Sequence, residues 1–298
     1  MYSTNTDRLV VETVEVDEAG EYEEDGDYII PGVSTTGSEV KCAFIEPAGS
    51  MTGKLFPSGQ PQQTLRVKPR SLLPSREPFD VRVSLVDAAN PFVLIDATSI
   101  STILKTVPSD DVLHRVVESI RREGAVAMGL ATTVDAAAHT RGTPKVALVY
   151  PPPLLVPSNE DKASDVRVQA YSMGLPHPSL QLTGAVCLAS ALCMPGTVVA
   201  GLSRKAAAAA DDDEAAAPVT PERTPSPVER EEEAGSSSSG DEEEERGPGR
   251  QVVIAHSKGT IRVGVVMTGD GRGVASCAVS RTARRLFEGR VRYYVQEG

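Results

Sequence analysis

The sequence predicts an α/β (α+β) protein with an aliphatic core. Most apolar segments alternate with polar residues in the two-residue period of a β-strand, whereas residues 110–122 carry an apolar stripe with the period of a helix. The 298 residues are enough for one large domain or two ordinary ones. Hydrophobic residues make up 40% of the chain and aromatic residues only 4%, so aliphatic side chains must fill the core.

Strands come first along the chain. Residues 8–16 and 39–46 alternate in the manner of strands, and residues 64–69 form a short third candidate after a turn at Phe56–Gly59. Strands that precede any helix leave their apolar face and their edges uncovered. We therefore expect that structure is missing upstream of Met1.

A hairpin is expected next. Residues 80–88 and 91–96 are strand candidates on either side of Asn90-Pro91, a dipeptide typical of turns. The second candidate is nearly all apolar, which indicates a central strand.

The amphipathic segment 110–122 predicts a helix. Asp110 or Asp111 is the expected N-cap, and Gly124 is the expected end of the helix. The inner stripe would consist of Val112, Leu113, Val116, Val117 and Ile120.

Two further strands, at residues 145–150 and 166–172, lead into a loop and a buried helix over about 183–193. Thr183 is a plausible N-cap, and Gly184 would let a ligand approach the backbone. The free amides at such a helix start suit an anion. A capped core helix without a ligand explains the same pattern, so both interpretations stay open.

Residues 204–250 have a different composition. They contain fourteen acidic and six basic residues, and therefore most of the net charge of −11, but no Leu, Ile, Met or aromatic residue. Such a segment cannot offset its ordering entropy by burial, so we expect a disordered acidic insert. Proline-directed kinases are its expected partners at Thr220, Thr224 and Ser226. A solvated insert without function is the alternative.

Strand patterns return after the insert, at residues 251–256, 260–267, 275–280 and 290–295. A tight turn is expected at 269–273, and residues 281–286 are expected to turn toward a helix. The pieces on both sides of the insert should therefore belong to one domain.

Composition also limits the class of protein. Four scattered cysteines suit neither a disulfide framework nor zinc, four dispersed histidines show no metal cluster, and the N-terminus has no signal-peptide pattern. No apolar run approaches the length of a membrane span, and no basic face for nucleic acid is evident. We expect a reduced, cytoplasmic protein that binds no metal, nucleic acid or membrane.

Several short blocks, in order, resemble one known family. They are Phe56–Gly59, Asn90-Pro91, Gly174–Pro178, Thr183–Cys187, Pro195–Thr197, His256–Gly264 and Ser280–Gly289. Together they resemble the PrpF family of 2-methylaconitate cis-trans isomerases and their methylitaconate-type and oxalomesaconate-type relatives. The resemblance covers nearly the whole chain apart from residues 203–250.

The resemblance implies a diaminopimelate epimerase-like fold, in which mixed sheets wrap around central helices and two helix starts face each other across a carboxylate. It implies an isomerase without a cofactor that moves a proton next to a carboxylate of a di- or tricarboxylate. Residues 1–76 would then be the C-terminal remnant of an incomplete first domain. Residues 77–203 and 251–298 would form the second domain, and a homodimer is an expected assembly.

The resemblance also suggests substrate-binding residues. Thr183 and Gly184 would be half of the amide cradle, and His177 would lie in the loop before it. Ser257 and Gly259 would present a hydroxyl and amides, although the family usually lacks a lysine such as Lys258 between them. The last residue of this set, Arg281, would pair with a carboxylate of the substrate. The alternative for Arg281 is a surface ion pair, and the alternative for His177 is a loop histidine held by its own backbone. We expect Cys187 to be a core residue.

The front of the chain departs from the family. The family's lysine loop and its Asn-Cys-Gly-Asn turn, which bear the proposed base and thiol, are absent, so the catalytic residues of this chain are unknown. We expect an N-terminally truncated PrpF-like isomerase with little or no activity. The alternatives are a non-catalytic interaction protein whose acidic segment is tuned by phosphorylation, and an amino-acid epimerase, which would need paired catalytic cysteines.

Overall fold

The computed structural model describes residues 1–68, 77–152, 164–204, 206, 249–286 and 288–290. These residues form a mixed sheet flanked by helices. The strands are β1 (Tyr2–Ser3), β2 (Arg8–Thr13), β3 (Val40–Ile45), β4 (Gln63–Val67), β5 (Phe79–Ala88), β6 (Asn90–Asp96), β7 (Lys145–Tyr150), β8 (Val166–Ser172), β9 (Leu175–Pro176), β10 (Arg250–His256), β11 (Gly259–Met267) and β12 (Val274–Arg281). The helices are η1 (Ala97–Ile100), α1 (Ser101–Thr106), α2 (Asp110–Ala127), α3 (Val134–Ala137), α4 (Leu182–Cys193) and α5 (Val198–Gly201).

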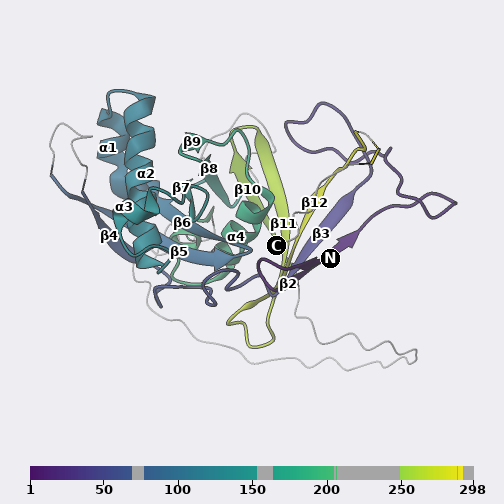
Figure 1. The fold of residues 1–298 in the computed structure, drawn as a ribbon, viewed down its shortest axis with the longest axis horizontal. Helices are drawn as coiled ribbons and strands as arrows, with labels where there is room; N and C mark the ends of the chain where they lie inside the picture. The colour runs from purple at the N-terminus through teal and green to yellow at the C-terminus, as the bar shows by residue number, and fades with distance from the viewer. Residues whose placement is uncertain (69–76, 153–163, 205, 207–248, 287, 291–298) are drawn as a thin grey trace, which may run out of the picture.

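The twelve described strands join in a single sheet. Its order is β1-β2-β3-β12-β11-β10-β8-β7-β6-β5-β4, and β9 pairs with β8 beside this path (Figure 1). The β6–β7 and β8–β10 pairs are parallel, and the other described neighbours are antiparallel. A strand near the start of the chain, β3, therefore pairs with the last described strand, β12.

Both faces of the middle of the sheet are covered. Along β6, Phe92 and Leu94 point into one hydrophobic cluster with α4, whereas Val93 and Ile95 point into a second cluster with α2. This alternation follows from the two-residue period of a strand. It explains why β6 is nearly all apolar. The strand is predicted to be central; it is an inner strand, third from the β4 edge of the sheet.

Helix α4 is enclosed by the chain on every side. Each residue from Gly184 to Leu192 is buried, and the helix contacts β5, β6, β10, β11, β12 and α5. Figure 1 shows α4 among these strands, while α1, α2 and α3 stand together at the other side of the sheet. The small side chains of this helix allow the close approach that such enclosure needs.

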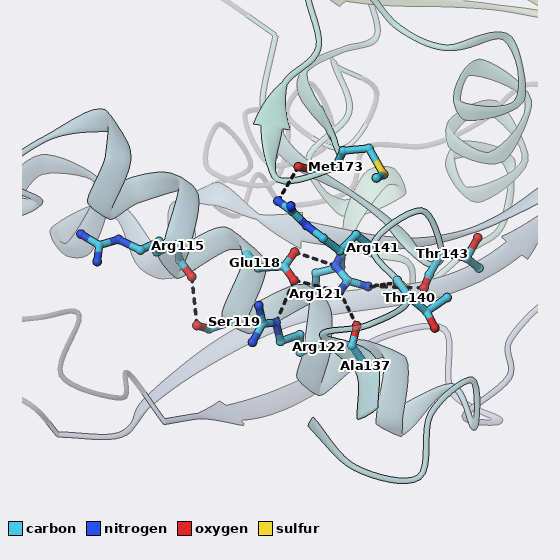
Figure 2. Close-up of polar contacts among 10 residues, drawn as sticks. All are labelled: Arg115, Glu118, Ser119, Arg121, Arg122, Ala137, Thr140, Arg141, Thr143 and Met173. Carbon is cyan, nitrogen blue, oxygen red and sulfur yellow. Dashed lines mark hydrogen bonds and ion pairs between the residues drawn. The ribbon is translucent and has the colours of Figure 1, made fainter. Parts of the chain in front are cut away.

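Helix α2 is fixed by a buried ionic cluster. The Arg121 side chain is only 2% exposed, and it donates to both carboxylate oxygens of Glu118 at 2.7 and 2.8 Å. The same guanidinium donates to the carbonyls of Ala137, Thr140 and Thr143, as Figure 2 shows. Arg122 adds a further bond to Glu118 at 2.7 Å. The cluster thereby ties α2 to the segment that leads into β7.

The predicted strands between residues 8 and 280 are confirmed, with shifts of a few residues at their ends. Helix α2 begins where predicted, but its predicted cap and end are wrong. Ser109 is the N-cap and accepts from the Val112 amide. The helix continues past Gly124 to Ala127, because Gly124 lies directly over Val93 of β6 and serves close helix–sheet packing there.

Three other local predictions are corrected. Thr183 is not the cap of α4, since the helix begins at Leu182 and follows Gln181, whose side chain makes no capping bond. The β5–β6 turn is centred on Ala89, with φ of 58°, and Pro91 already pairs with Asp87 inside the ladder. Residues 282–286 form no helix after β12.

Some predictions fall on other parts of the chain. Most of the acidic segment 204–250, including Thr220, Thr224 and Ser226, lies outside the described residues, as do residues 291–295 of the expected last strand. Within the described part, no helix has the length and apolar character needed to cross a membrane.

We expect Glu118→Gln to destabilise the protein by about 3 kcal/mol, because the buried Arg121 charge loses its carboxylate partner. Burial raises the pKa of Glu118, but hydrogen bonds from Arg121 and Arg122 outweigh burial and leave this pKa lowered. The ion pair therefore stabilises the fold above the ordinary glutamate pKa, and this contribution is lost as the pH falls through the lower folded-state pKa. Urea unfolding of both proteins at neutral and acid pH measures the effect.

The matched control is Arg115→Gln on the same helix. Arg115 forms an exposed pair with Asp111 at 2.8 Å, and such pairs are worth less than about 1 kcal/mol. Equal losses for the two variants, or an acid-independent loss for Glu118→Gln, would contradict the role of the cluster.

Gly124→Ala should destabilise the protein by about 1–3 kcal/mol through overpacking, although alanine favours helices. A β-carbon at residue 124 would lie 2.4 Å from Cγ2 of the buried Val93. Gly201→Ala is the control, because nothing lies within 4 Å of its added methyl group. Thermal unfolding should separate the two variants; a neutral Gly124→Ala would refute the packing argument.

Candidate functional site

The start of α4 carries polar groups without partners in the described part of the chain, next to the loop that enters the candidate site. Gln181 precedes the helix, and both polar atoms of its side-chain amide are buried without a hydrogen-bond partner among the described residues. The first helical amides have no acceptor within the helix, and they carry the positive end of its dipole. The Gln181 side chain and the first backbone amides of α4 are therefore groups that could bind a polar ligand.

A cavity of about 610 Å³ lies beside the loop that enters α4. We call it the arginine cavity, and it is lined by residues 28–33, Pro178–Leu180, His256, Lys258 and Arg281, among others. Its size is in the range of small-molecule sites. The strand ends of β10 and β12, the β10–β11 turn and the loop before α4 meet here.

Arg281 ends β12, where its backbone pairs with Val40 of β3. Its guanidinium donates to the Ser280 carbonyl at 2.8 Å, but it forms no ion pair with any described residue. Burial lowers the pKa of Arg281, because the charged form is partly removed from water. A half-buried guanidinium without a carboxylate is suited to receive one from a ligand.

The β10–β11 turn carries Ser257 and Gly259. The Ser257 hydroxyl donates to the Pro178 carbonyl at 2.7 Å, which ties the turn to the loop before α4. Gly259 has φ of 136°, and a β-carbon there would lie 2.6 Å from the side chain of Pro31. The exposed Lys258 lines the cavity between them, so this departure from the family pattern adds a cation to it.

His256 is a residue that the sequence analysis missed as a site candidate. It ends β10 and lines the arginine cavity, and its pKa is lowered by burial, by Arg281 and by His177, in that order. The Lys258 amide donates to His256 Nδ1 at 3.2 Å. Its position at a strand end immediately before the Ser-Lys-Gly turn was the available signal.

The arginine cavity is not lined by the other three expected site residues, His177, Gly184 and Thr183. His177 is held by the Ser179 backbone, with Nδ1 2.7 Å from the Ser179 carbonyl oxygen. Gly184 packs on the core, since a β-carbon there would lie 2.9 Å from Phe92 Cζ. Thr183 lines a separate cavity of about 420 Å³, formed with the first residues of the chain and Cys42.

Cysteine and metal chemistry find little support in the described structure. Cys187 is fully buried in α4, burial raises the pKa of its thiol, and its predicted place in the core is confirmed. No three His, Cys, Asp or Glu side chains of the described residues are grouped as metal ligands. The geometry instead offers a cationic, partly desolvated cavity that can bind a carboxylate.

Comparisons with known proteins point in the same direction. A family model described as PrpF protein matches residues 1–211. The putative isomerase YraM of Bacillus subtilis (strain 168) is 30% identical over 208 residues, which cover 68% of this chain and 54% of YraM. The 3-methylitaconate isomerase of Eubacterium barkeri is 28% identical over 309 aligned positions, covering 100% of this chain and 67% of that protein.

A solved structure agrees with these matches. The crystal structure of methylitaconate-delta-isomerase has a TM-score of 0.66 at 27% identity, and the match covers 97% of this chain and 64% of that one. The chain thus spans about half to two thirds of the length of these relatives. The resemblance found in the sequence is confirmed: with 211 residues matched by the family model, the chain belongs to the PrpF family.

Proposed function

We propose that this chain carries the carboxylate-binding part of a PrpF-type isomerase. The reaction would be a cofactor-independent proton transfer that moves a double bond, or changes its geometry, in an unsaturated di- or tricarboxylate of the 2-methylaconitate type. The observation that carries this proposal is Arg281, which is half-buried and unpaired among the described residues. The names of the relatives, a 3-methylitaconate isomerase and a 2-methyl-aconitate isomerase, support the substrate class.

The arginine cavity fits the electrostatics of this chemistry. Removal of a proton next to a carboxylate builds negative charge on that carboxylate. Arg281, His256 and Lys258 line the cavity and would oppose this charge. Partial burial strengthens such interactions, because water screens them less.

The proposed activity also needs groups that remove and return the proton. The chain contains no Asn-Cys-Gly-Asn turn and no Gly/Ser-rich lysine loop, which bear the family's thiol and base. We propose that residues 1–76 belong to an incomplete first unit of a diaminopimelate epimerase-like fold, and that 77–203 and 251–298 form the second. The arginine cavity belongs mainly to the second unit. This chain would therefore keep the residues that bind the substrate but lack those that transfer the proton.

We also propose a cytoplasmic protein that assembles as a homodimer. All four cysteines are free, which suits a reducing compartment. The kinase sites at Thr220, Thr224 and Ser226 remain predictions from their sequence motifs alone.

Calorimetric titration with trans-aconitate, an unsaturated tricarboxylate, tests the binding site. We expect Arg281→Gln to weaken binding about tenfold, equivalent to about 1.4 kcal/mol. Affinity should rise as the pH falls through the lowered His256 pKa, because the protonated ring adds a cation, and His256→Asn should remove that rise.

The control for this titration is Arg66→Gln. Arg66 lies on β4 at the far edge of the sheet and is paired with Asp80. Unchanged affinity in Arg281→Gln would rule out the arginine cavity as the carboxylate site.

An NMR assay with 2-methylaconitate tests the activity separately. We expect the 298-residue chain to give no turnover above the buffer rate, because the thiol and base motifs are missing. The Eubacterium barkeri 3-methylitaconate isomerase, assayed with its own substrate, is the positive control. Turnover that disappears in Arg281→Gln would show that this chain supplies its own base.

A further inference from the structure

A second cavity, of about 530 Å³, lies on the α2 face of the sheet. We call it the tyrosine cavity. The residues that matter for its chemistry are Asp110 and His114 of α2, Tyr150 of β7, Arg167 and Tyr171 of β8, and His256. Its lining residues come from the first turns of α2, from β7 and β8, and from the end of β10. It is separate from the start of α4, which packs on the opposite face.

Tyr171 has an unused hydroxyl in this cavity. The residue is only 3% exposed, yet its hydroxyl makes no hydrogen bond to any described residue and is not sealed from the cavity. Burial, followed by Tyr150 and Asp110, raises the pKa of Tyr171 to about 12, so the phenol remains a donor at neutral pH. Buried tyrosine hydroxyls normally have a partner, so an acceptor is expected here.

Arg167 provides a cation next to Tyr150 in the same cavity. It pairs with Tyr150 across the β7–β8 ladder, and its Cζ lies 4.4 Å from the centre of the Tyr150 ring. Stacking holds the plane of the guanidinium and leaves its N–H edge available. Arg167 forms no ion pair with any residue of the described part of the chain.

Among the other groups that line the cavity, hydrogen-bond donors still outnumber acceptors. His114 meets the Tyr171 ring edge-on at 5.9 Å, so its ring packs against the phenol. Asp110 is the acidic residue facing the cavity, and it sits in the first turn of α2, where the helix dipole offsets its charge. One guanidinium and two phenols thus face a single exposed carboxylate.

We propose that the tyrosine cavity is a second oxyanion site, in which a small carboxylate or phosphate group binds between Arg167 and the hydroxyls of Tyr150 and Tyr171. This site goes beyond the proposed isomerase function. His256 lines both cavities, so an anion bound here would lie next to the candidate substrate site.

The test uses the full chain with Arg281→Gln, which removes the cation of the arginine cavity. Calorimetric titrations with malonate and, separately, with inorganic phosphate measure the binding that remains. We expect at least one of the two anions to bind, and its affinity to fall about tenfold with Arg167→Gln and again with Tyr171→Phe. The anion that binds more tightly identifies the source of the oxyanion group, and either one supports the site.

The controls separate binding from folding. Arg66→Gln removes an exposed arginine far from the cavity and should leave the affinity unchanged. Tyr171→Phe keeps the ring, and its urea midpoint should match that of the parent. Binding of neither anion, or affinities that Arg167→Gln and Tyr171→Phe do not change in folded protein, would overturn the proposal.

Discussion

The enclosure of α4 is the constraint on which the rest of the structure depends. An apolar helix can be buried on every side only if small residues let strands approach it closely. Gly184 is buried against Phe92, where an added β-carbon would lie 2.9 Å from Cζ of the ring. Because β5, β6, β10, β11 and β12 all reach this helix, segments far apart in sequence become neighbours around it. The start of α4 and the strand ends beside it are thereby brought to one place.

The opposite face of the sheet is held by a different interaction. Helix α2 covers β4 to β7 with aliphatic side chains, but it is anchored by a buried charge, Arg121, whose donors are satisfied by Glu118 and three carbonyls. Such a cluster is costly to break, because it leaves an unpaired charge in the core. It fixes the position of α2 over the sheet, and hence the walls of the tyrosine cavity.

The two cavities differ in the side chains that line them. One lies at the end of β12 and is lined by Arg281, His256 and Lys258, and the other lies on the α2 face and is lined by Arg167, Tyr150 and Tyr171. His256 stands between them.

The sequence by itself determined the strands, the inner stripe of α2, the burial of β6 and the family, because periodicity and ordered motifs are local properties. Only the tertiary structure decided that α2 continues past Gly124, since Val93 of β6 requires a glycine there. Likewise, no local pattern could show that His256 and Arg281 line one cavity, because the pairing of β10, β11 and β12 brings them to it. Which residues form a site depends on which chain segments lie together, and here the long-range packing around α4 decides this.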